Sequence, residues 1–144
     1  MTHAGMIAEM LGGRTVFKQR VSEDAELEEI VRAGIPAQAL YELADRTDTT
    51  LTALTSVVGI DRGTFARRAR MKARLKTDES DRVVRVARIA ALAVDAMGEE
   101  DGLAWLHEPN YALGDRVPIE LLETEVGARQ VEQVIGRIEH GVFS

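Results

Sequence analysis

The chain has 144 residues and no cysteine, which excludes disulfides, thiolate zinc sites and cysteine nucleophiles. This composition fits a reducing compartment, and we expect a cytoplasmic protein. The three histidines, His3, His107 and His140, are far apart, and none stands at a metal-ligand spacing. No nucleophile is paired with a general base in a recognisable pattern. We therefore expect a protein that is not an enzyme and that carries no cofactor and no metal.

Long apolar runs and alternating segments are also missing. No stretch is apolar over the length that a bilayer requires, and no signal-peptide pattern is present, so we expect no membrane partner. No segment alternates between apolar and polar residues for more than a few positions, whereas apolar residues recur at helical spacing. The sequence therefore predicts an all-α globular protein with one good core or two small ones.

The charge of the chain is unevenly distributed. The net charge of −6 argues on its own against nucleic acid as a partner. Residues 61–76, however, contain seven basic residues and one acidic residue, and we call them the basic segment. The residues before it contain five basic and nine acidic side chains, and those after it six and fourteen. One strongly positive segment thus stands in an otherwise acidic protein.

Residues 51–70, which overlap the basic segment, fit a helix-turn-helix template. Gly59 can adopt the left-handed conformation of the turn, and Thr55 is small enough for the two helices to approach one turn earlier. Apolar residues stand where the helices need to contact each other: Leu54, Val58, Ile60 and Phe65. The second helix is expected over Arg62–Arg70.

In such a motif the early residues of the second helix face base edges, and its later arginines reach phosphates. The candidate DNA-binding residues are Arg62, Thr64, Arg67, Arg68, Arg70 and Lys72. Because the whole chain is acidic, we expect tight binding only from a homodimer on a two-fold site. The alternative interpretation is a solvent-exposed basic helix followed by a linker.

These patterns divide the chain into three parts. Residues 1–24 are expected to form an N-terminal arm, ordered or flexible, with Thr15–Val21 as a short strand or an ordered arm. Residues 25–76 are expected to form the helix-turn-helix domain, and residues 77–144 a C-terminal helical domain. Helix starts are predicted at Ser22 or Asp24, Pro36, the cluster Asp48–Thr50, Asp61, Thr77 and Thr124, and helix ends at Gly34, Gly59, Gly98 and Gly141.

The C-terminal half of the chain carries a set of residues in a fixed order. They are Ser80, Asp81, Arg82, Ala104, Trp105, Leu106, Pro109, Asn110, Leu113, Gly114, Pro118, Leu121, Leu122, Thr124, Gly127, Val131, Arg137, Ile138 and Gly141. With these residues, the chain from Leu75 to the end resembles the toxin-binding domain of Xre/MbcA/ParS-type antitoxins.

This resemblance implies a function for both halves of the chain. In such antitoxins the helix-turn-helix binds the promoter of their own operon. The C-terminal domain holds a toxin, commonly a RES toxin that attacks NAD or transfers ADP-ribose, with the antitoxin C-terminus near the toxin's dinucleotide site. The partners implied are therefore a cognate RES-like toxin and operator DNA. The alternative is a free-standing transcription regulator with a C-terminal dimerisation or ligand-sensing domain.

Carried onto this chain, the toxin-binding tip is Arg137, Ile138, Glu139, His140, Gly141, Val142, Phe143 and Ser144. Gly141 would free the last residues from the helix, so that Val142 and Phe143 form an apolar plug. The Ser144 carboxylate could replace an anionic group of the toxin's substrate. The alternative is that Val142 and Phe143 fold back on the chain's own core. Trp105 is interpreted as a core anchor, with an interface contact as the alternative.

Overall fold

The computed structural model describes residues 1–141, and over this range the fold is all-α, as the sequence predicts. The α-helices are α1 (His3–Met10), α2 (Gly13–Phe17), α3 (Asp24–Ala33), α4 (Gln38–Arg46), α5 (Leu51–Val58), α6 (Arg62–Arg70), α7 (Thr77–Met97), α8 (Glu99–Trp105) and α9 (Glu125–Glu139). Two 3₁₀ helices, η1 (Tyr111–Leu113) and η2 (Pro118–Glu123), connect α8 to α9. Residues 1–141 contain isolated β-bridges but no strand.

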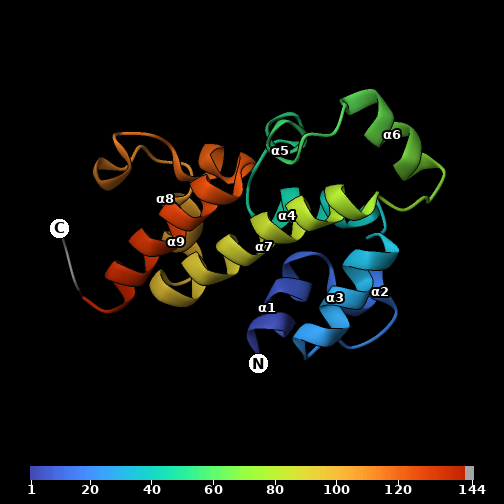
Figure 1. Ribbon diagram of the computed structural model, residues 1–144, viewed down its shortest axis with the longest axis horizontal. Helices are drawn as coiled ribbons and strands as arrows, with labels where there is room; N and C mark the ends of the chain where they lie inside the picture. Colours follow the sequence, from blue (N-terminus) through green and yellow to red (C-terminus); the bar gives the residue numbers. More distant parts are fainter. Residues whose placement is uncertain (142–144) are drawn as a thin grey trace.

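The 21-residue helix α7 is the central element (Figure 1). Helices α1 and α3 pack against it on one side, and α8 and α9 pack along its C-terminal part. Its alanines allow this close packing, since Ala87, Ala90 and Ala93 are completely buried. One hydrophobic core runs from α1 to α9 around this helix. The limits predicted at residues 24 and 76 stay predictions, because this single core connects all three segments.

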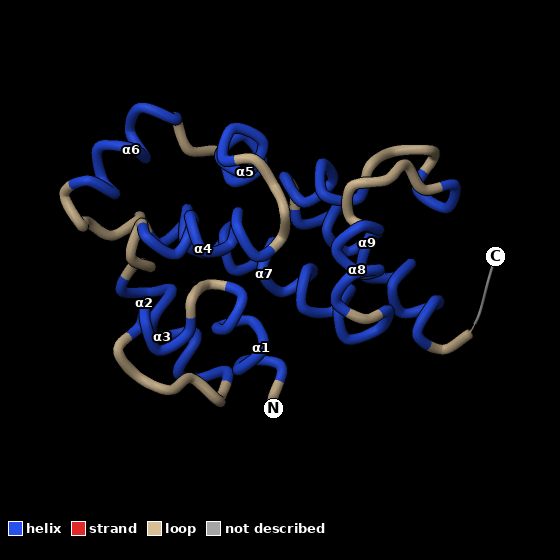
Figure 2. Tube along the Cα trace, turned by 180° about the vertical axis from the view of Figure 1, so that it is seen from behind, coloured by secondary structure: helices blue, strands red, loops and turns tan. Residues whose placement is uncertain are grey.

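The N-terminal segment differs from its prediction. It forms α1 and α2, both packed on the core, and Thr15–Val21 contains no strand (Figure 2). Val16 and Val21 are buried five positions apart, a spacing that an alternating strand does not give. Two consecutive left-handed glycines, Gly12 and Gly13, connect the two helices with φ angles of 106° and 54°.

Three of the predicted helix caps are confirmed. The Thr50 hydroxyl accepts a hydrogen bond from the Ala53 amide at 3.1 Å, the Asp61 carboxylate from Thr64 at 3.0 Å, and the Thr124 hydroxyl from Gly127 at 2.9 Å. Each cap satisfies an amide of the first helical turn that has no partner inside the helix. These contacts fix the starts of α5, α6 and α9.

Three other predicted starts are wrong. Glu23, rather than Ser22 or Asp24, precedes α3 as its cap residue. Pro36 pairs in an isolated bridge with Arg74, and α4 begins two residues later at Gln38. Thr77 is the first residue of α7, and Lys76 rather than Thr77 is the cap residue.

The Thr77 hydroxyl donates to the Arg32 carbonyl at 3.0 Å, while Glu79 accepts from the Lys76 amide at 2.8 Å. In each case a longer-range contact or a neighbouring acidic residue replaces the expected local cap.

Gly127 allows the start of α9 to lie against the end of η2. A Cβ atom at this position would stand 2.0 Å from the Leu121 carbonyl oxygen, far inside any real contact. Gly136 lies in the same helix, and a Cβ atom there would meet nothing within 4 Å. Packing therefore requires a glycine at position 127 but not at position 136.

We expect Gly127→Ala to lower the free energy of unfolding by about 1–3 kcal/mol, because the backbone of η2 has to move. Gly136→Ala is the control and should raise it by about 0.5–1 kcal/mol, since alanine restricts the unfolded chain and favours the helix. Urea unfolding followed by circular dichroism measures both. Equal effects of the two changes would contradict the packing role of Gly127.

Candidate DNA-binding and partner-binding surfaces

Helices α5 and α6 form the helix-turn-helix that the sequence predicts. Gly59 is left-handed with a φ of 69°, and the Ile60 amide donates to the Thr55 carbonyl at 3.0 Å, which closes the turn. The predicted contact residues are all buried: Leu54, Thr55, Val58, Ile60 and Phe65. The Phe65 ring packs against the Tyr41 ring of α4, with centroids 5.0 Å apart. The second helix is thereby fixed to the domain by its apolar side.

Two arginine contacts join this motif to α7. The Arg82 Nε donates to the Val58 carbonyl, the last of α5, at 2.7 Å. The Arg68 guanidinium pairs with Glu79, whose side chain is only 10% exposed. These contacts hold the turn and the C-terminal half of α6 to the central helix.

The predicted DNA-binding residues fall into two groups. Arg62, Arg67, Arg70 and Lys72 are exposed. Within residues 1–141, none of the four has a carboxylate partner within 4.0 Å, although Arg62 donates to the Thr52 hydroxyl. They therefore present free positive charge on and just beyond α6.

Arg68 and Thr64 are held inside the domain. Arg68 is half-buried on Glu79, and the Thr64 hydroxyl donates to the Asp61 carboxylate at 3.3 Å. Their part in binding DNA stays a prediction, and the contacts seen here give both a structural role.

The start of α6 depends on the ionised form of Asp61. Hydrogen bonds from the Thr64 amide and hydroxyl, with smaller contributions from the Gly63 amide and the Arg67 charge, lower the pKa of this carboxyl below its ordinary value of 3.8. The folded state thus favours the charged carboxylate. The stabilisation is complete above the ordinary pKa and is lost as the pH falls through the lowered folded-state pKa.

We expect Asp61→Ala to lower both the urea midpoint and the affinity for operator DNA, because α6 loses its cap. Asp61→Asn is the control, since asparagine caps as well as aspartate but without a charge. The difference in midpoint between Asp61→Asn and the parent protein should be constant near neutral pH and change only in acid. A difference that is independent of pH in acid would contradict the role of the ionised cap.

At the other end of the molecule, α9 is buried along one side and exposed at its end. Val131, Val134 and Ile135 lie in the interior, and the predicted tip begins where this side ends. Arg137, Glu139, His140 and Gly141 are exposed and Ile138 is half-buried. Gly141 follows the end of α9 and is left-handed with a φ of 71°. Val142, Phe143 and Ser144 lie outside the described residues.

The arginines of α7 do not point to a partner. Arg85 pairs with Glu125 at 3.3 Å, and Arg88 pairs with both Glu125 and Glu132 of α9. These ion pairs attach α9 to α7.

Sequence reasoning missed two exposed apolar side chains in the C-terminal half. Tyr111 is 86% exposed on the loop after α8, and Val126 is 63% exposed in the first turn of α9. The loop is ordered by the Asn110 side chain, which accepts from the Ala112 amide at 2.9 Å. Trp105 is half-buried against the core, as the core-anchor interpretation predicts. A tyrosine directly after a proline–asparagine turn was the available signal for an exposed ring.

Among residues 1–141, no group of three or more histidine, cysteine, aspartate or glutamate side chains could hold a metal ion. Over the same range, no helix has both the length and the apolar character needed to span a bilayer.

Family models match both parts of the chain that carry the candidate surfaces. Residues 26–88 match the Antitoxin Xre-like helix-turn-helix domain, and residues 92–141 match the Antitoxin Xre/MbcA/ParS C-terminal toxin-binding domain. A protein of Photorhabdus laumondii named Antitoxin Xre is 33% identical over 125 residues, which cover 85% of this chain and 84% of that protein. The chain belongs to the Xre antitoxin family.

Two further relatives agree with this Xre assignment. A Yersinia enterocolitica protein named Antitoxin Xre is 44% identical over 88 residues, which cover only 60% of each chain. A Sphingobium protein named Prs ADP-ribosylating antitoxin is 26% identical over 125 residues, covering 80% of this chain and 79% of that protein. The two family matches end and begin inside α7, so one continuous helix connects the helix-turn-helix and the toxin-binding domain.

Proposed function

We propose that this Xre antitoxin neutralises a RES-like toxin that consumes NAD or transfers ADP-ribose, and that it represses its own operon by binding the promoter. The match of residues 92–141 to a toxin-binding domain carries the first part. The Sphingobium relative, whose name links an antitoxin to ADP-ribosylation, supports this class of toxin. The exposed cations of α6 support the second part.

The DNA-binding surface is formed by Arg62, Arg67, Arg70 and Lys72, which are exposed and free of carboxylate partners within residues 1–141. The planar guanidinium group binds phosphate oxygens or guanine edges with paired hydrogen bonds. Because the whole chain carries a net charge of −6, one copy attracts DNA weakly. A homodimer on a two-fold site places two such helices on one duplex and overcomes this repulsion.

The toxin-binding tip is the end of α9 with the residues that follow it. Arg137, Glu139 and His140 are exposed there and free to contact a partner. Beyond Gly141 the sequence supplies two apolar side chains, Val142 and Phe143, which can fill an apolar part of a toxin pocket. The toxin and the antitoxin then form a hetero-oligomer in which this tip blocks the active site.

We expect Arg67→Ala to weaken binding to the promoter duplex and to reduce the dependence of the binding constant on salt. Each lost phosphate contact should reduce the slope of log K against log salt by about 0.9. Fluorescence anisotropy at several salt concentrations measures this slope. Arg129→Ala is the control, because Arg129 is equally exposed on α9 and has no ion pair within residues 1–141.

The change Arg68→Ala separates folding from DNA binding. It leaves the nearly buried Glu79 without its cation and should lower the urea midpoint, whereas Arg67→Ala should leave the midpoint unchanged. Unchanged affinity and salt slope for Arg67→Ala would place the DNA-reading surface elsewhere.

We expect deletion of residues 142–144 to release the activity of the toxin while the complex still forms, because the plug is lost and the rest of the domain remains. Co-expression of toxin and antitoxin, scored for growth and for co-purification, measures both effects. Glu29→Ala, an exposed change on α3, is the control and should protect fully. Circular dichroism should show that the shortened protein is folded, and full protection by that protein would reject the plug.

A further inference from the structure

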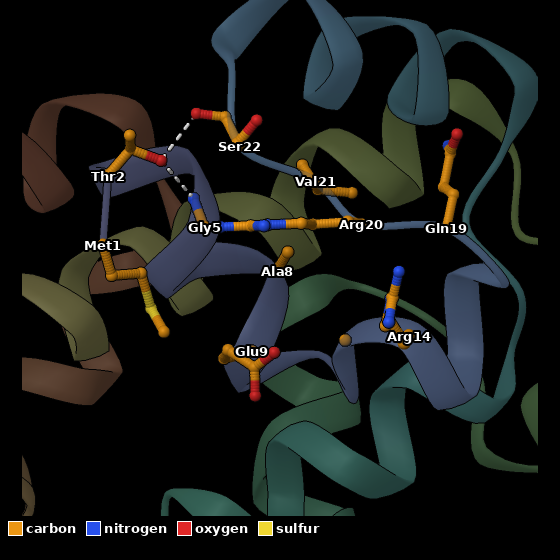
Figure 3. Close-up of a pocket in the computed structure, with 11 residues that line it drawn as sticks. Met1, Thr2, Gly5, Ala8, Glu9, Arg14, Gln19, Arg20, Val21 and Ser22 are labelled. Atoms are coloured by element: carbon orange, nitrogen blue, oxygen red, sulfur yellow. Dashed lines mark hydrogen bonds between the residues drawn. The ribbon is translucent and has the colours of Figure 1, made fainter.

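A hollow near the N-terminus lies away from both proposed surfaces. It has a volume of about 830 Å³, is partly open to solvent, and is lined by α1, α2 and residues 19–22 (Figure 3). Neither family match includes these residues, since the first begins at residue 26. The proposed DNA and toxin contacts leave it without a function.

Two arginines from different elements reach into this hollow. The Arg20 side chain crosses it toward Gly5 of α1, and the Arg14 side chain rises from α2 toward the segment that carries Gln19 and Arg20 (Figure 3). Within residues 1–141, neither guanidinium has a carboxylate oxygen within 4.0 Å. Glu9 also lines the hollow, but its carboxylate lies against the backbone of Gly13. Two positive charges and the Glu9 carboxylate therefore line one space, and within residues 1–141 neither arginine forms an ion pair.

The backbone that carries these arginines is fixed. Lys18 is left-handed with a φ of 62°, and its amide donates to the Arg14 carbonyl at 2.9 Å, so the chain reverses after α2. Two residues beyond Arg20, the Ser22 carbonyl accepts from the Thr2 hydroxyl at 2.6 Å, while Val21 is buried. Arg20 is thus held between an anchored turn and a residue packed in the core.

Small residues keep the hollow open. Gly5, Ala8 and Gly13 form part of its wall. A Cβ atom on Gly5 would stand 3.2 Å from the Thr2 hydroxyl and 3.4 Å from the Val21 carbonyl oxygen. There is therefore little room for a side chain at this position. Larger side chains here would occupy the space that the arginines now face.

We propose that this hollow binds a phosphate group, held by Arg14 and Arg20. Two like charges in one hollow repel each other, and an anion between them removes this cost. Guanidinium groups bind phosphate with paired, charge-assisted hydrogen bonds, and the Gln19 amide, which also lines the hollow, supplies a neutral donor. Residues 1–60 carry more acidic than basic side chains, so this local concentration of positive charge does not follow from composition.

The phosphate can come from a free phosphate compound or from the backbone of bound DNA. The second source has a structural basis, since Lys18 lines an adjoining hollow together with Arg74 of the basic segment. The two hollows share Gln19 as a lining residue, so the Arg14–Arg20 hollow lies next to one that reaches the basic segment. The experiment needs one arm for each source.

The first arm titrates the full chain with inorganic phosphate and with pyrophosphate, using calorimetry and backbone amide shifts. We expect saturable binding with one site per chain and shifts centred on residues 13–22. Arg14→Gln and Arg20→Gln should each weaken it by about ten-fold, the effect of losing one charge-assisted contact. Arg129→Gln should leave it unchanged, and Arg20→Lys should restore part of it. Circular dichroism checks the fold of each variant.

The second arm measures promoter-duplex affinity for the same variants. A loss for Arg14→Gln and Arg20→Gln, together with competition by pyrophosphate, would identify the DNA backbone as the source. Unchanged duplex affinity with phosphate binding intact would identify a free phosphate compound. Absence of saturable phosphate binding in the parent protein, or equal losses for Arg129→Gln, would overturn the proposal. None of these variants alters the proposed DNA-reading or toxin-binding residues, and the first arm is independent of the function proposed above, whereas the second arm rests on its promoter binding.

Discussion

The burial of α7 is the constraint on which the rest of the structure depends. Val83, Val86 and Ile89 have almost no exposed surface, and helices from both ends of the chain supply the atoms that cover them. Burying such side chains is the main favourable term in folding a chain of this size. A single helix therefore stabilises the helix-turn-helix and the toxin-binding domain together. Neither has a core that is complete without it.

Apolar burial alone does not fix how the helix-turn-helix is oriented against the toxin-binding domain. Polar contacts between them do. Arg82 holds the end of α5 through the Val58 carbonyl, and the Ser80 hydroxyl accepts from the Ile35 amide at 2.8 Å. A third connection runs from the loop after α8, where the His107 Nε2 lies 2.9 Å from the Thr47 carbonyl. Because buried polar groups need such partners, each contact permits one placement of the helix-turn-helix against the toxin-binding domain. The relative position of the two surfaces is thus encoded by a few residues.

The sequence predictions are correct where the deciding contact comes from a nearby residue and wrong where it comes from a distant one. The caps at Thr50, Asp61 and Thr124 were predictable because a side chain bonds an amide three residues away, and no tertiary contact competes. Pro36 and Thr77 were mispredicted because residues 38 and 45 positions distant pair with them. The N-terminal segment failed for a related reason. Its buried residues, Val16 and Val21, face the core from a short helix and a loop, and no regular period reveals this.

The same difference between local and distant contacts applies to the candidate sites. A positive segment in an acidic chain, with a glycine turn before it, was sufficient to locate α6. The sequence could not separate Arg67 from Arg68, because their neighbours in the chain are equivalent and only the distant Glu79 distinguishes them. The hollow between Arg14 and Arg20 was equally hidden, since it depends on the reversal of the chain at Lys18.

The positions of the proposed DNA-binding surface and of the proposed toxin-binding tip restrict how toxin binding can affect DNA binding. Helix α6 and the end of α9 lie at opposite ends of the long axis (Figure 1). A toxin that contacts only the end of α9 would leave the cations of α6 uncovered. Its influence on promoter binding would then act through the number of antitoxin copies in one assembly, or through α7 and the His107 contact. Since α7 is closely packed along its length and closely packed interiors resist deformation, assembly is the less costly route.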